Sequence, residues 1–130
     1  INNPDLRVAL SMDDAWKALN DVSELLMGCV VVRSDFADKH PEAVRAFLEE
    51  YKVSIQDANA DLDTTAELCE QYDIIPKAAV AKVAIPNCNL TYMDGQEMKS
   101  AVRGYLQVLY DANPKSVGGS MPDDGFYYIK

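Results

Sequence analysis

The stretch that decides the expected fold is GCVVVR, residues 28–33. From Cys29 to Val32 it is an unbroken apolar run, rich in β-branched side chains. Such a run is typical of a strand that is covered on both faces, so we expect Cys29 to be a small buried side chain. Apolar and polar residues alternate from Leu6 to Leu10, which predicts a second short strand.

Apolar residues recur at helical spacing through most of the remaining chain. The clearest amphipathic helix is expected from Pro41, which suits a first helical position, to Ala58. A last helix is expected from about Gly95 to Asn113. Shorter helices are expected at residues 11–26, at 64–71 behind a capping box that opens at Thr64, and at 76–86, with a turn at 34–38. The pattern predicts an α/β fold that is helix-rich and has few strands.

Length and charge exclude several classes of function. The 130 residues fit a single domain, residues 1–130, with one modest core. The formal net charge of −9 repels phosphate backbones, so we expect no nucleic-acid partner. The longest apolar run, residues 27–32, falls far short of the roughly 20 residues that a membrane-spanning helix needs.

Three cysteines and one histidine limit the chemistry that the chain can perform. A zinc site needs four nitrogen or sulfur ligands in paired spacing, and because the sequence lacks such a set we expect neither metal nor cofactor. Cys69 and Cys88 can form a disulfide in an oxidising compartment; otherwise they are separate buried thiols. His40 directly precedes Pro41 at the start of a helix, where we expect it in solvent. We therefore expect no catalytic residue and no enzyme.

Three adjacent aromatic residues, Phe126 to Tyr128, lie close to the end of the sequence. Leaving three aromatic side chains in water is costly, so we expect this tail to pack back onto the domain. In the alternative interpretation these aromatic residues line a ligand cleft.

Two runs of sequence resemble one family of proteins. They are VVVRSDFADKHPEAVRAFL at 30–48 and SVGGSMPDDGFYY at 116–128, supported by AIPNCN at 84–89. The runs resemble ABC-transporter substrate-binding proteins of the nitrate/sulfonate/taurine and thiamine-precursor type. The resemblance covers roughly Leu10 to the end of the chain.

The resemblance implies a two-lobed protein with the type II periplasmic-binding fold, of which residues 1–130 are the C-terminal portion. Such a protein binds a small-molecule ligand between its lobes, outside the cytoplasmic membrane, and delivers it to ABC permease subunits. It is periplasmic, or a lipoprotein at the cell surface. Trp16 and Met27 are the candidate ligand-binding residues, because they flank the expected return of the chain to the hinge.

Two alternatives remain open at this point. One is an enzyme of the thiamine-pyrimidine biosynthesis type on the same fold, and the other is a stand-alone helical interaction domain. One or two strands cannot form a stable sheet by themselves, so a fragment would expose strand edges. Self-association of the chain is therefore a further expectation of the fragment interpretation.

Overall fold

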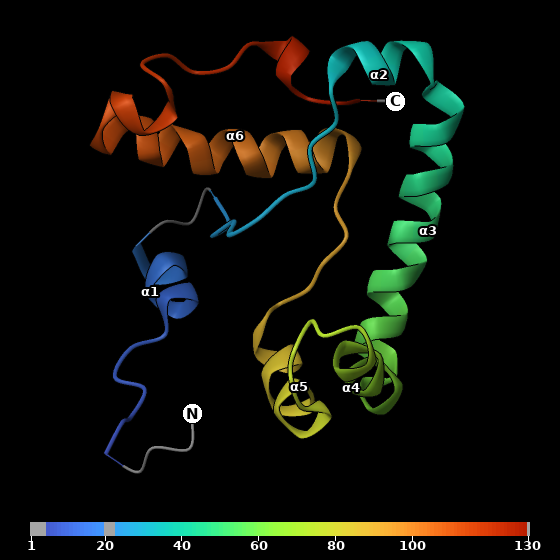
Figure 1. Cartoon of the computed structure of the whole chain (residues 1–130). Coiled ribbons are helices and arrows are strands. Elements are labelled where there is room, and N and C mark those ends of the chain that lie inside the picture. The colour runs from blue at the N-terminus through green and yellow to red at the C-terminus, as the bar shows by residue number, and fades with distance from the viewer. Residues whose placement is uncertain (1–4, 20–22, 130) are drawn as a thin grey trace. The chain divides into compact units, whose positions relative to one another are not determined.

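Helices make up 65% of the computed structural model, and no strand occurs in residues 5–19 and 23–129, which are the residues that the structure describes (Figure 1). The prediction of an α/β fold is therefore wrong, and so is the assignment to a lobe of the type II periplasmic-binding fold. The contacts divide the chain into two compact units: unit 1 comprises residues 1–30 and 93–130, and unit 2 comprises residues 31–92.

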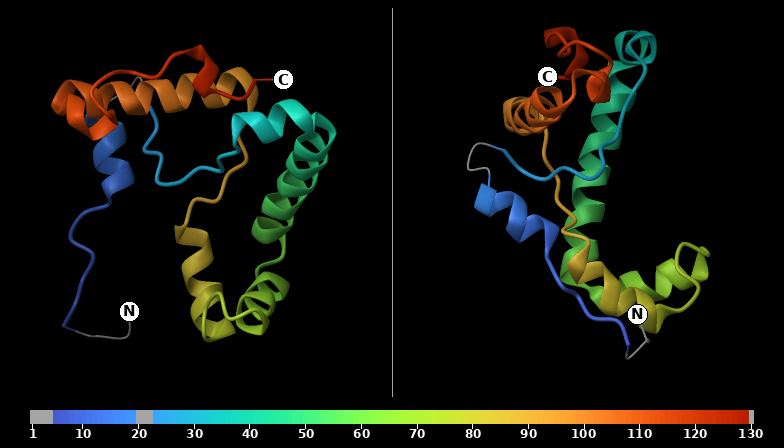
Figure 2. Two further views of the ribbon diagram at one scale, coloured as in Figure 1. Left: turned by 45° about the horizontal axis from the view of Figure 1, so that its top comes forward. Right: turned by 90° about the vertical axis from the view of Figure 1, so that its left-hand side faces the viewer.

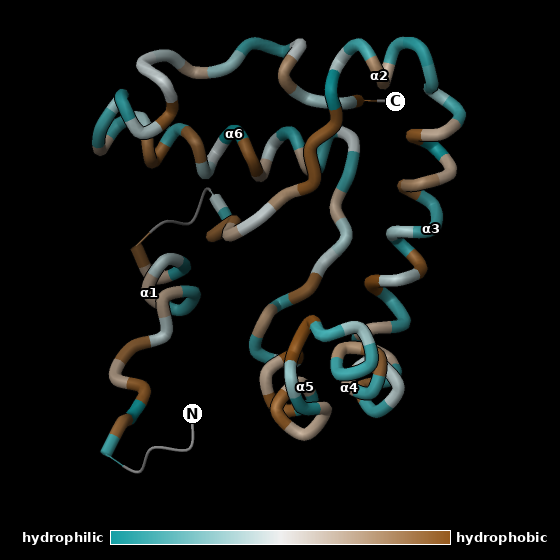
Figure 3. The backbone as a smooth tube through the Cα atoms, viewed as in Figure 1, coloured by the Kyte–Doolittle hydropathy of each residue, from teal (hydrophilic) through white to brown (hydrophobic). Residues whose placement is uncertain are grey.

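The two segments that were expected to be strands are irregular and exposed. Val8 is 87% exposed and Val31 is 81% exposed, and Cys29, which was expected to be buried, is exposed as well. In Figure 3 the tube is brown just before α2 (Ser34–Lys39), where this apolar run lies. A strand forms only when its backbone pairs with a neighbour, and no described segment pairs with either one. The apolar run thus indicates a need for burial that these residues alone do not meet.

A helix replaces the turn that was expected at residues 34–38. This helix, α2, ends where the backbone N–H of His40 donates to the carbonyl oxygen of Phe36 at 2.8 Å. His40 is exposed, as predicted, and its ring centroid lies 4.8 Å from that of Phe36. Pro41 then begins α3 (Pro41–Ala60), which confirms the clearest helix of the sequence.

The core of unit 2 lies between α4 (Leu62–Gln71) and α5 (Ala78–Ala84), which are side by side in both Figures 1 and 2. Ala66, Ala81 and Ile85 are buried there, the last in a 3₁₀ turn, η1 (Ile85–Asn87). Two alanines at the contact allow the two helices to approach closely. Because only three residues form this cluster, the buried apolar area is small.

Polar contacts cap the start of α4 and link α4 to α5. The Asp61 carboxylate accepts a hydrogen bond from the backbone N–H of Thr64 at 3.1 Å, so α4 begins earlier than the capping box expected at Thr64. The Glu70 carboxylate accepts from the backbone N–H of Ala78 at 2.7 Å. Lys82 on α5 forms an ion pair with Asp63 on α4.

Unit 1 contains α1 (Met12–Leu19), α6 (Gly95–Ala112) and two 3₁₀ turns, η2 (Pro114–Val117) and η3 (Asp124–Phe126). The end of α6 at Asn113 confirms the prediction. Helix α1 is shorter than the helix expected at residues 11–26, because residues 23–26 are not helical. The expected helical residues 20–22 lie outside the described residues.

The C-terminal tail folds back along α6, as Figures 1 and 2 show. The Asp124 carboxylate lies 2.8 Å from Lys99 Nζ on α6, and the same ammonium lies 5.7 Å from the ring centroid of Tyr127. Tyr127 is buried, which confirms that the tail packs onto the domain, whereas Phe126 stays exposed. Tyr128 is half-buried, so two of the three aromatic residues are at least partly covered.

Candidate functional site

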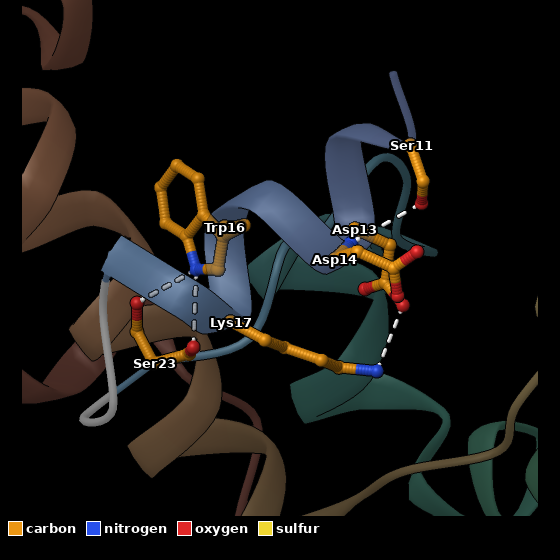
Figure 4. A network of polar contacts seen from close by, with 6 residues as sticks. All are labelled: Ser11, Asp13, Asp14, Trp16, Lys17 and Ser23. Carbon is orange, nitrogen blue, oxygen red and sulfur yellow. Dashed lines mark hydrogen bonds and ion pairs between the residues drawn. The ribbon is translucent and has the colours of Figure 1, made fainter. Parts of the chain in front are cut away.

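A small network of polar contacts surrounds α1 in unit 1 (Figure 4). Ser11 Oγ accepts a hydrogen bond from the backbone N–H of Asp14 at 3.2 Å, which satisfies a donor at the start of the helix. One turn along, Lys17 Nζ lies 2.7 Å from an Asp13 carboxylate oxygen. The hydrogen bond to Asp13, reinforced by the charge of that carboxylate, raises the pKa of Lys17.

Trp16, one of the two candidate ligand-binding residues, belongs to this network. Its indole N–H donates to the backbone carbonyl oxygen of Ser23 at 3.0 Å and lies 3.2 Å from Ser23 Oγ (Figure 4). Its ring centroid lies 5.4 Å from that of Tyr105 on α6. Trp16 thus joins three segments of unit 1, and its single polar hydrogen is already used within the chain.

Met27, the other candidate, is not part of the network. It lies in the irregular segment after Ser23 and is 85% exposed. The structure therefore gives Met27 an open surface position and Trp16 a packed one. That both contact a ligand stays a prediction.

The three cysteines are free in this structure. Cys69 is half-buried against the core of unit 2, and Cys88 is exposed, with its Sγ 3.4 Å from the carbonyl oxygen of Ala84. The disulfide between Cys69 and Cys88 stays a prediction. Within the described part of the chain, no three acidic, histidine or cysteine residues lie close enough together to hold a metal ion.

A groove of about 680 Å³ runs along α3 and α4 in unit 2. It is open to solvent and mostly apolar. Its apolar lining comprises Val53 from α3, Leu68 from α4, and Tyr72 and Ile74 from the turn that follows α4. Tyr72 is 67% exposed and Ile74 is 70% exposed. Large apolar side chains therefore gather in one groove of unit 2 and are open to solvent.

The charged side chains that line the groove all carry the same sign. They are Glu49, Glu50 and Asp57, all on α3. No lysine, arginine or histidine is among the lining residues. The groove is therefore an apolar surface bordered on one side by negative charge, which attracts cations and repels anions.

Sequence reasoning missed this groove for an identifiable reason. Glu49 and Glu50 fit the solvated polar face of an amphipathic helix, but Val53 lies on that face as well and is exposed. An exposed β-branched residue one turn after two adjacent acids was a usable signal. Tyr72 and Ile74 gave no such signal in the sequence, because their position beside α3 depends on how α4 packs.

Comparison with known proteins gives no further guide to the site: no family model, curated protein or solved structure matches the chain significantly. Among the helices in the described residues, none combines the length and the apolar character that crossing a bilayer requires. The function is therefore argued from the residues and their arrangement.

Proposed function

We propose that this chain is part of an extracytoplasmic solute-binding protein that captures a small nutrient and delivers it to an ABC permease. Two observations support the proposal. One is the sequence resemblance of residues 30–48 and 116–128 to such proteins. The other is the amount of surface that the chain leaves uncovered, which indicates that further protein covers it.

The uncovered surface is the observation that carries the proposal. The chain has an accessible surface of 10073 Å² at a mass of 14.4 kDa. A compact monomer of that mass exposes about 6,800 Å², and two separate compact bodies of half the mass expose about 8,200 Å² together. The accessible surface of the chain therefore exceeds that of compact proteins, whether the two units are treated as one body or as two.

Much of the excess comes from large apolar side chains that natural domains seldom leave in water. The run Val30 to Val32 and the alternating residues Leu6, Val8 and Leu10 are all exposed. Each such side chain gains roughly 1.5–3 kcal/mol when fully buried. Additional protein packed on these segments would recover that free energy, as expected for one part of a larger receptor.

A receptor of this kind needs binding and closure and no chemical step. The described residues suit that role, because the Trp16 ring packs on Tyr105 and its N–H is held by Ser23. A ring fixed in this way can present a face to a ligand at a low entropic cost. Met27, exposed and flexible in its side chain, can adapt to the shape of a ligand.

Thermal-shift screening of the complete protein that contains this chain tests the proposal. The compounds would be thiamine precursors, sulfonates and other small organic nutrients. A ligand at 100 times its Kd stabilises the folded state by about 2.7 kcal/mol, which raises the melting temperature by several degrees. We expect one class of compound to give such a shift.

The matched variant is the complete protein with Met27→Ser, at an exposed position, which should keep the fold and lose part of the shift. A complete protein that gives no shift with any nutrient, although it is folded by circular dichroism, would contradict the proposal.

A second candidate function is a stand-alone helical interaction domain, and one observation favours it. The described residues are helical without any strand, and a groove lies on α3 and α4. This candidate requires the chain alone to be monomeric and to unfold cooperatively. Sedimentation and urea unfolding of residues 1–130 distinguish the stand-alone domain from the receptor part. The exposed apolar segments of a receptor part favour association over a monomer.

A further inference from the structure

We propose that the groove on α3 and α4 binds a basic amphipathic helix of a partner protein. This inference does not depend on the solute-binding function, because it rests on contacts within unit 2 alone. Three features carry it: the apolar lining, the sign of the charges beside it, and the shape that two neighbouring helices give to the groove.

The apolar lining supplies the area for binding. Val53, Leu68, Tyr72 and Ile74 all line the groove. All four side chains are exposed to solvent in this structure, so a bound partner would remove them from water. Burial of apolar area drives most protein association, and an aromatic side chain such as Tyr72 is typical of the residues that contribute most.

The charges select the kind of partner. Glu49, Glu50 and Asp57 follow one side of α3 at spacings of one and seven residues, so they extend along about two turns of the groove. Three cations of unit 2 have other partners: Lys82 pairs with Asp63, Arg45 pairs with Glu42, and Lys52 Nζ lies 5.8 Å from the ring centroid of Tyr92. Lysine or arginine side chains of a partner would therefore meet carboxylates that have no basic lining residue beside them.

The groove is lined by residues of α3 and α4, and a groove between helices suits an amphipathic helix as its occupant. A groove between helices accepts an amphipathic helix whose apolar side chains recur every three or four residues, while its basic side chains reach the border. A second copy of this chain fits poorly, because its net charge of −9 opposes the acidic border. Charge complementarity thus favours a basic partner over self-association.

The test uses a synthetic 16-residue peptide with leucine and lysine at helical spacing and a fluorescent label. Fluorescence anisotropy measures its binding to the complete protein that contains this chain. We expect saturable binding that weakens as salt rises, since salt screens the charges at the border. The same peptide with glutamate in place of lysine keeps the apolar face and should not bind.

Two matched double variants locate the binding site. Glu49→Gln with Glu50→Gln removes two charges beside the groove, and Glu24→Gln with Glu67→Gln removes two charges outside it. We expect the first pair to weaken binding about fivefold and the second less than twofold. Ile74→Ser, at an exposed position, should also weaken binding without changing the circular dichroism spectrum.

Two results would overturn the proposal. Equal loss of affinity in both double variants would show that the peptide responds to net charge and not to the groove. Dimerisation of the chain in sedimentation experiments, abolished by Ile74→Ser, would show that a second copy occupies the groove.

Discussion

The indole of Trp16 illustrates how one side chain can hold unit 1 together. Its N–H donates to Ser23, and its ring lies near Tyr105 on α6. Replacing it as Trp16→Phe keeps a ring near Tyr105 and leaves the Ser23 carbonyl oxygen without this donor. Because a hydrogen bond contributes about 1 kcal/mol, we expect the free energy of unfolding to fall by about that amount.

Urea unfolding followed by circular dichroism measures this change, since Trp16 is the only tryptophan and its fluorescence disappears with it. Ser23→Ala is the control: it removes Oγ and keeps the carbonyl acceptor, so its effect should be smaller. Equal stability of Trp16→Phe and the unaltered chain would show that the hydrogen bond contributes nothing.

Asp124 makes the attachment of the tail sensitive to acid. Its hydrogen bond to Lys99, then the charge of Lys99, hold the pKa of Asp124 below its ordinary value. A carboxyl group with a lowered folded pKa stabilises the fold above its unfolded pKa and loses that contribution as the pH falls through the folded value. We expect the tail to loosen only below about pH 4.

Limited digestion with an acid-active protease across the range pH 2–6 follows the loosening of the tail. In Asp124→Asn the digestion rate should be higher at pH 6 and should change less on acidification. If the unaltered chain and this variant show the same pH profile, the ion pair with Lys99 does not hold the tail.

The thiol state of Cys69 and Cys88 indicates whether the protein matures in an oxidising compartment. Both are free here, yet an exported protein would have the opportunity to pair them. Peptide mapping of the protein from its native source, alkylated while denatured and not reduced, should find Cys29 alkylated and Cys69 and Cys88 protected. Three free thiols would exclude the disulfide.

At the scale of elements, the helices were predictable because their signals are local. Pro41 and the spacing that follows it define the start of α3, and Asn113 marks the end of α6. Helix α2 was missed because Ser34 and Asp35, which favour turns, also suit the first residues of a helix.

The two predicted strands do not form, because a strand depends on partners that the local sequence does not reveal. The run Val30 to Val32 has the composition of a buried strand, and in this chain it remains exposed. The groove escaped prediction for a related reason. Its apolar lining comes from two helices and a turn, so it exists only once α3 and α4 are packed.

The tail is an element whose contribution can be measured by deletion. Removing residues 126–128 takes away the buried Tyr127 ring and its contact with Lys99, so we expect a clearly lower melting temperature. Tyr127→Phe should cause little or no loss, since the buried hydroxyl has no hydrogen-bond partner. An unchanged melting temperature after deletion would show that the packing of the tail contributes no stability.

At the scale of the whole molecule, the balance of buried and exposed apolar residues supports the proposed receptor. Among residues 5–19 and 23–129, six apolar residues are buried and twenty large apolar residues are exposed. A domain with so small a core is marginal in stability, because burial must offset a conformational entropy of similar size. We propose that the remainder of a solute-binding protein covers the exposed apolar segments at 6–10 and 30–32, which do not line the groove on α3 and α4.

The intact mass of the endogenous protein tests this central proposal most directly. An antibody against the exposed segment at 114–120 would capture the protein from the extracytoplasmic fraction for mass spectrometry. The proposal predicts a mass well above 14.4 kDa, with this sequence contained in a longer chain. A captured protein of 14.4 kDa, folded and monomeric, would contradict it.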